Sequence, residues 1–160
     1  MKRILIIVLL TASIFSCKKE RTVLYDVQDA YVKRDGANKS RLKTTTEFIA
    51  IAYSDIFGTT IPQNKLDEIS LVYESFGDKK LMEDIIVKNF INNSSAQIPS
   101  TSAMNADLDK FITGAYKKLY SREPSETEAF KVKELIKSNS AITPTVVYYA
   151  LMTSNEYRYY

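Results

Sequence analysis

The feature that most constrains the fold of this 160-residue chain is a repeated helical pattern. Residues 48–57 match residues 111–120, with Phe, Ile, Ala and Tyr at the same places in both segments. The apolar residues recur at i, i+1, i+4, i+5, i+8 and i+9, which is one broad face of an α-helix. A proline follows each segment, Pro62 in the first and Pro124 in the second. The pattern therefore predicts two copies of one helical unit.

Capping residues predict where the second helix of each unit begins. Thr60 with Gln63, and Ser125 with Glu128, have the spacing of a capping box. Gly77 is predicted to end the second helix of the first unit in a left-handed conformation. In the second unit, the polar residues 138–140 interrupt the pattern at the equivalent place.

A third helix is predicted to begin at Asp78 in the first unit and at Thr143 in the second, where Pro144 suits the first turn. The positions predicted to be buried in the second and third helices share helical spacing. They are Leu66, Ile69, Val72, Tyr73, Phe76, Leu81, Ile85, Ile86, Phe90 and Ile91 in the first unit, and Phe130, Val132, Leu135, Ile136, Val146, Val147, Ala150, Leu151 and Tyr157 in the second.

We therefore expect an all-α fold made of two duplicated three-helix units. They span residues 46–94 and 107–160, and a polar linker of residues 95–106 joins them. Three short helices bury little surface alone, so the units are expected to pack as one small domain. Chance similarity of two amphipathic helices is the alternative, but the shared order of helix, proline, capping box and break argues against it.

The start of the chain has the layout of a lipoprotein signal. A basic start is followed by the apolar residues 4–16, about 20 Å of helix, too short for a hydrocarbon core of about 30 Å. Residues 14–16 resemble a lipobox before the only cysteine, Cys17. The layout resembles Bacteroidetes-type lipoproteins, which implies that residues 1–16 are removed and that Cys17 carries acyl chains. A plain secretory signal is the alternative.

Charge is distributed unevenly along the rest of the chain. Residues 18–43 contain eight basic and four acidic side chains, and residues 44–160 contain twelve basic and fifteen acidic ones. Residues 17–45 are therefore predicted to form a basic tether beside an anionic membrane, with a merely solvated tether as the alternative. The mildly acidic remainder argues against nucleic-acid binding. A lysine directly after the cysteine, here Lys18, resembles the pattern of lipoproteins sent to the outer membrane. Either face of that membrane is compatible with the sequence.

The second unit resembles a short helical domain of unknown function found in bacterial surface-layer and secreted repeat proteins, and its pattern is similar to phycobilisome linker domains. The resemblance covers about 47 residues and lies in residues 111–112, Tyr116, 119–124 and 154–157. Ser121 replaces the family's glycine, and no Asp-Gly follows the proline. The resemblance implies a helical scaffold and interaction module without catalytic residues.

The turn after the first helix differs between the two units. Gly58 keeps the family's glycine in the first unit, where the arginine is lost. In the second unit, Arg122 is expected to bridge to a carboxylate such as Glu156. We expect that role to be structural rather than ligand binding.

The residue types leave little room for catalysis. The chain has no histidine, and acylation of Cys17 would remove its only thiol, so no cofactor or metal is predicted. Paired carboxylates can support acid–base chemistry, but each group here lies on an expected polar helix face. The groups are Asp67 with Glu68, Glu83 with Asp84, Asp107 with Asp109, and Glu123 with Glu126 and Glu128. We therefore predict that the protein is not an enzyme.

Tyrosines are concentrated at the end of the chain. Tyr157 is expected in the core. Tyrosine is favoured at interfaces, so the remaining aromatic and basic residues are a candidate partner-binding surface, with a tail docked on its own domain as the alternative. The candidate residues are Tyr148, Tyr149, Arg158, Tyr159 and Tyr160.

These features favour a non-catalytic accessory lipoprotein. Acyl chains on Cys17 would hold it at the outer membrane, where it would bind an outer-membrane or periplasmic protein. The alternative is a surface module that captures glycan or peptide through exposed tyrosines. A small hydrolase using carboxylates is a third possibility.

Overall fold

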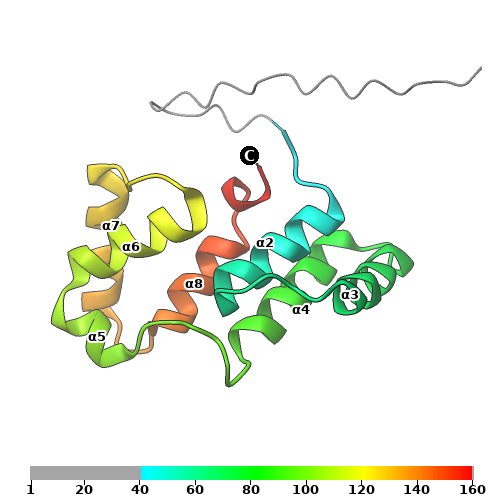
Figure 1. Ribbon diagram of the computed structural model, residues 1–160. Helices are drawn as coiled ribbons and strands as arrows, with labels where there is room; N and C mark the ends of the chain where they lie inside the picture. The colour runs from blue at the N-terminus through cyan, green and yellow to red at the C-terminus, as the bar shows by residue number, and fades with distance from the viewer. Residues whose placement is uncertain (1–40, 160) are drawn as a thin grey trace, which may run out of the picture. The chain divides into compact units, whose positions relative to one another are not determined.

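The computed structural model describes residues 41–159, which contain seven α-helices, one 3-10 helix and no β-strand. The all-α prediction is confirmed for this part of the chain (Figure 1). The signal peptide, Cys17, most of the tether and Tyr160 lie outside the described residues. The elements are α2 (Thr45–Phe57), α3 (Gln63–Ser75), α4 (Lys79–Ile91), α5 (Thr101–Ala106), α6 (Leu108–Tyr120), α7 (Glu126–Ser138), α8 (Pro144–Met152) and the 3-10 helix η2 (Glu156–Arg158).

The first unit consists of α2, α3 and α4. A capping box of Thr44 and Glu47 begins α2; its Ser/Thr-x-x-Glu spacing is visible in the sequence, but it was not predicted. Gly58 ends α2 with a left-handed φ of 68°. Asp78 begins α4 by accepting a hydrogen bond from the amide of Leu81, as predicted.

Two predictions about the ends of α3 are wrong. Pro62, not Thr60, occupies the N-cap and has no side-chain hydrogen bond there. The extended ψ of this proline, 140°, excludes Pro62 from the helix, so Gln63 is the first helical residue. At the other end, α3 stops at Ser75 because Phe76 is extended, with φ −100° and ψ 138°. Gly77 therefore does not form a left-handed cap, and among the glycines of residues 41–159 it is Gly58 that has a positive φ.

The second unit consists of α6, α7 and α8. The predicted capping box of Ser125 and Glu128 is present at the start of α7. Thr143 caps α8, and Pro144 lies in its first turn, as predicted. Ser121 ends α6 with a left-handed φ of 56°, so it has the same conformation as the equivalent Gly58 in the first unit.

The linker is more ordered than a polar Ser/Thr/Pro sequence predicts. Residues 101–106 form the short helix α5, which Ser100 caps by accepting a hydrogen bond from the amide of Ala103. Met104 of this helix is only 1% exposed, so it anchors the linker to the core. Upstream, the amide of Gln97 donates to the carbonyl of Ile56 over 2.7 Å. The second half of the predicted polar linker thus contains a short helix.

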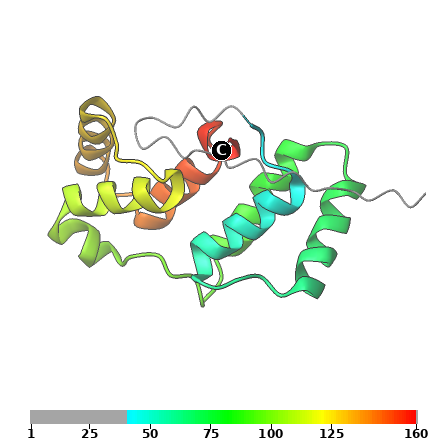
Figure 2. The same ribbon diagram turned by 45° about the horizontal axis from the view of Figure 1, so that its top comes forward.

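The third helices of the two units, α4 and α8, are equivalent residue by residue. Along residues 81–87 and 146–152, successive side chains are exposed, buried, buried, half-buried, exposed, buried and buried in both helices. The two helices pack against each other (Figures 1 and 2). Asp84 and Tyr149 occupy equivalent positions and hydrogen-bond to each other, as residues do beside a two-fold axis. The duplication thus extends to how the units pair.

The outer helices α3 and α7 bury fewer side chains than predicted because they lie at opposite ends of the helical array and meet neighbours on one side only (Figure 1). Tyr73 and Ile136 are their only fully buried residues. Leu66, Ile69 and Val132 on these two helices are half-buried. The predicted core positions that are exposed include four at α3 and α7, namely Val72, Phe76, Phe130 and Leu135. On the third helices, Leu81, Ile85, Val146 and Ala150 are also exposed.

Candidate interaction site

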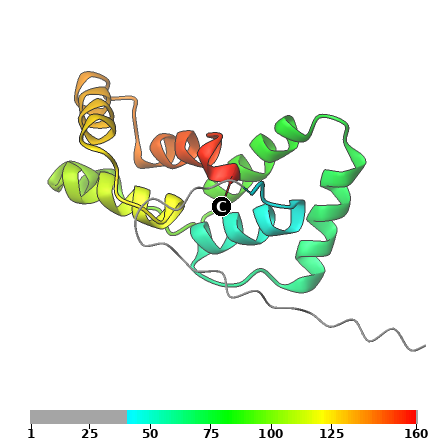
Figure 3. The same cartoon turned by 90° about the horizontal axis from the view of Figure 1, so that it is seen from above.

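The segment after α8 leaves the second unit and lies on the first. We call residues 154–159 the C-terminal strap. Its backbone pairs with the residues that precede α2: the amide of Lys43 donates to the carbonyl of Arg158 over 2.9 Å, and Leu42 forms an isolated β-bridge with Tyr159. Figure 3 shows this end of the chain beside the start of α2. The strap therefore holds together the two ends of the part of the chain that the structure describes.

Tyr157 is the most deeply inserted residue of the strap, with 1% of its surface exposed. Its ring meets the ring of Phe48 edge to face, with centroids 6.0 Å apart. Its hydroxyl donates to Asp55 over 2.7 Å, and the ammonium of Lys43 lies 4.2 Å from the ring centroid. Burial raises the pKa of Asp55, while the Tyr157 hydrogen bond and the Lys43 charge act in the opposite direction. These contacts confirm that Tyr157 is a core residue.

Arg158 forms the second anchor of the strap. Its Nη2 lies 3.0 Å from Oε1 of Glu83, and their side chains are only 14% and 9% exposed. The same Glu83 oxygen accepts a hydrogen bond from the hydroxyl of Tyr73 over 2.9 Å. The guanidinium also lies 4.7 Å from the ring centroid of Phe48. Nη1 is buried and has no hydrogen-bond partner among residues 41–159, so the pair is only partly satisfied.

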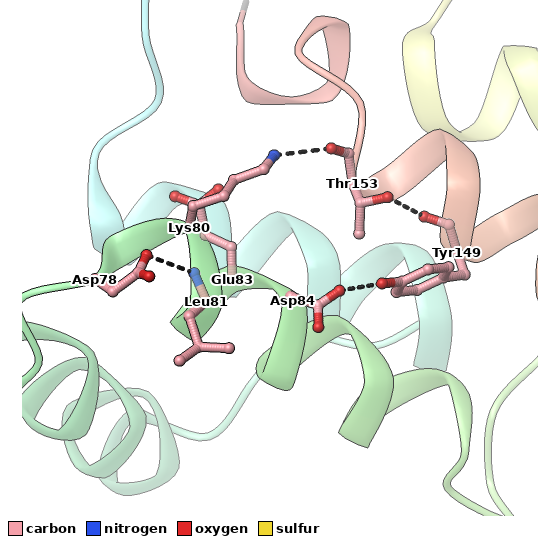
Figure 4. A pocket seen from close by; sticks show the side chains of 7 residues that line it. All are labelled: Asp78, Lys80, Leu81, Glu83, Asp84, Tyr149 and Thr153. Carbon is pink, nitrogen blue, oxygen red and sulfur yellow. Dashed lines mark hydrogen bonds between the residues drawn. The ribbon is translucent and has the colours of Figure 1, made fainter.

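A groove of about 470 Å³ lies between α4 and α8, next to this buried pair. Its lining residues are Asp78, Lys80, Leu81, Glu83, Asp84, Tyr149 and Thr153 (Figure 4). Lys80 donates to the carbonyl of Thr153 over 2.9 Å, and Tyr149 donates to Asp84 across the groove. The polar groups that line the groove are thus mainly used to join the two units.

The Arg122 bridge predicted from the sequence is confirmed. Arg122 donates to both oxygens of Glu156 over 2.6 and 2.7 Å and to both oxygens of Glu128 over 2.9 and 2.7 Å. Arg122 lowers the pKa of Glu128 to about 2. Its guanidinium also lies 5.3 and 5.5 Å from the rings of Tyr116 and Tyr120. With two carboxylates already bound, Arg122 holds the strap to the second unit.

Four of the five residues of the predicted partner-binding surface are described, and these four do not lie together on an exposed face. Tyr148 is 3% exposed and packs near Phe111, with ring centroids 6.4 Å apart. Tyr149 and Arg158 bind carboxylates of the first unit. Tyr159 is 39% exposed, and Tyr160 lies outside the described residues. The described residues of this set thus lie mainly against their own domain, as in the alternative of a docked tail, and partner binding by them stays a prediction.

Exposed apolar side chains on α3, α4, α7 and α8 are a different set of candidates for partner contact. All of them except Leu71 were predicted to be core, so they were missed as candidates. Val72 and Leu135 are 44% and 57% exposed and occupy equivalent positions in α3 and α7. Leu81 and Val146 are 50% and 44% exposed and are equivalent in α4 and α8. The first unit adds Leu71, Phe76 and Ile85, and the second adds Phe130.

The grouped carboxylates are the remaining candidates for acid–base or metal chemistry. No group of three or more His, Cys, Asp or Glu side chains that could hold a metal occurs within residues 41–159. The carboxylates were expected on solvated helix faces. Glu83 departs from this expectation, because it is buried against Arg158. Among the described helices, none is long and apolar enough to cross a membrane.

No protein-family model matches this chain, and the comparisons with curated proteins and with solved structures give no match. The resemblance of the second unit to a surface-layer domain therefore remains a prediction.

Proposed function

We propose that this protein is a non-catalytic accessory lipoprotein, held at the outer membrane by acyl chains on Cys17, that binds another protein of the cell envelope. The anchor is inferred from the signal-like start of the sequence. The observation that carries the binding role is the set of exposed apolar residues on α3 and α4: Leu71, Val72, Phe76, Leu81 and Ile85.

These residues give a partner substantial apolar area to cover. Leu71 is 70% exposed and Phe76 is 52% exposed. Leu81 and Ile85 are one turn apart, so they share one face of α4. Covering apolar surface contributes about 25 cal/mol per Å², and concentrations of exposed apolar residues on soluble proteins mark interaction sites.

The alternative of glycan or peptide capture by exposed tyrosines has less support. Residues 41–159 contain eight tyrosines, and only Tyr159 is more than a third exposed. Stacking against sugars or peptides needs accessible ring faces. The described tyrosines mostly fill the core or hydrogen-bond to carboxylates, as Tyr73 does to Glu83 and Tyr149 to Asp84.

The test is affinity capture from native membranes solubilised in a mild detergent, through a tag placed behind a spacer after Tyr160, followed by crosslinking mass spectrometry. We expect stoichiometric recovery with an envelope protein, with loss of that protein in the Leu81→Asp variant. The equivalent Val146→Asp variant tests whether the second unit takes part. Recovery of the wild-type lipoprotein alone, with Cys17 acylated, would refute the binding role but not the anchor.

A further inference from the structure

The C-terminal strap is arranged on the first unit as a peptide ligand is arranged on its receptor. Tyr157 inserts its ring against Phe48 of α2 and reaches Asp55 at the far end of the same helix. Arg158, the next residue, reaches Glu83 of α4. The strap backbone also pairs with residues 42–43, as an added strand does in β-augmentation.

The receiving site has a defined chemical preference. Phe48 serves both strap residues, since one ring contacts the Tyr157 ring and the Arg158 guanidinium. Asp55 accepts the phenol hydroxyl, and Glu83 accepts the guanidinium. An aromatic residue with a terminal hydroxyl followed by an arginine satisfies all of these contacts, and the two carboxylates give the site the opposite charge to its ligand.

The strap is fixed by contacts that another copy of the same residues can reproduce. A buried ion pair adds little net stability relative to apolar packing. The Arg158–Glu83 pair therefore makes the site selective for arginine rather than fixing the strap irreversibly. One Arg158 nitrogen has no hydrogen-bond partner within residues 41–159, so the strap does not satisfy all of its buried polar groups in the site. The Tyr–Arg pair of a partner can make the same contacts, and it competes against the effective concentration of the tethered strap.

We propose that the first unit carries a binding site for peptide segments with a Tyr–Arg pair, and that the C-terminal strap is the resident, exchangeable ligand of this site. The partner is a protein segment in which tyrosine precedes arginine. This inference depends neither on the lipid anchor nor on the exposed apolar residues of α3 and α4.

The experiment uses the whole mature chain with Cys17→Ser and a fluorescent peptide with the sequence of residues 154–159. The Tyr157→Ala/Arg158→Ala variant keeps its strap but leaves the site open. We expect saturable peptide binding to this variant, at least about tenfold tighter than to the protein with its native strap, because there the site is occupied. Replacing Tyr or Arg in the peptide by Ala is expected to weaken binding at least about tenfold.

Glu83→Gln, added to the open-site variant, tests the assigned charge contact and is expected to weaken binding by a similar factor. Glu68→Gln on the exposed surface of α3 is the matched control and should leave the affinity unchanged. If the open-site variant does not fold, a protease site inserted between Thr153 and Ser154 allows the native strap to be cut and exchanged for labelled peptide. Absence of binding and exchange, or binding indifferent to the arginine and to Glu83, would overturn the proposal.

Discussion

The buried pair of Arg158 and Glu83 leads to the sharpest prediction about stability. Replacing Arg158 by Ala leaves the Glu83 carboxylate buried, with the Tyr73 hydroxyl as its remaining hydrogen-bond donor in the structure. Breaking a buried ion pair costs about 3–5 kcal/mol. Because the two side chains keep 14% and 9% exposure, we expect the lower end, about 3 kcal/mol.

Urea unfolding at pH 7.5, followed by circular dichroism, gives the change in the free energy of unfolding. In a folded region of this size, a loss of 3 kcal/mol lowers the Tm by about 10 °C. The matched control is Lys117→Ala. It breaks a pair with Glu123 in which both side chains are more than half exposed, and it should cost less than about 0.5 kcal/mol.

A double variant that lacks both charges distinguishes the effect of the ion pair on stability from the effect of side-chain packing. Arg158→Met with Glu83→Gln keeps an acceptor for Tyr73 and buries no charge, so it should recover most of the lost stability. If Arg158→Ala unfolds within about 1 kcal/mol of the wild type, or if the double variant is no better than the single one, the reasoning about this pair is refuted.

Three further predictions concern the ends of the helices. Ser121→Gly should raise stability by up to about 1 kcal/mol, because glycine adopts the left-handed conformation without strain; an unchanged or lower Tm would contradict this. Gly58→Ala should lower it by about 1–2 kcal/mol, since φ is 68° and the new Cβ would lie 2.6 Å from Oε1 of Gln97; urea unfolding measures the loss, and a neutral result would show that the turn relaxes. The hydrogen bond from Arg122 lowers the pKa of Glu128 to about 2, so the stability that it contributes is present above pH 4.5 and lost as the pH falls towards 2. Glu128→Gln should make that acid dependence shallower, and an unchanged slope between pH 4.5 and 2 would speak against the assignment.

The sequence was sufficient to predict the three helices of each unit and the N-caps of α4, α7 and α8. The Phe, Ile, Ala and Tyr positions shared by the two units are local patterns, and the Ser125 box needs only residues three apart. Arg122 with Glu156 was also predicted, since the arginine follows a turn and the carboxylate lies in the closing segment.

Burial on the outer helices was not predictable from spacing alone. A stripe of apolar residues shows that a helix is amphipathic, but it does not show how many neighbours cover the stripe. Val72 and Leu135 continue such stripes and are nevertheless exposed, because no other helix of residues 41–159 lies outside α3 or α7.

The strap contacts were hidden for a different reason. Lys43, Asp55 and Glu83 are charged residues whose partners lie far along the chain, and nothing local distinguishes them from solvated side chains. Lys43 is 6% exposed and Glu83 is 7% exposed. Only the return of residues 157–158 to the first unit brings their partners within reach.

The pairing of Lys43 with the strap also affects how the protein folds. These contacts join residues separated by 114 positions, so the chain must close a very long loop before they form, and such closure slows folding. A circular permutant that joins Tyr159 to Arg41 through a few glycines, and opens the chain at the exposed Ser95, would make the same contacts local. The second unit would then precede the first, and the permuted protein would reach the native packing faster than the natural order of the chain allows.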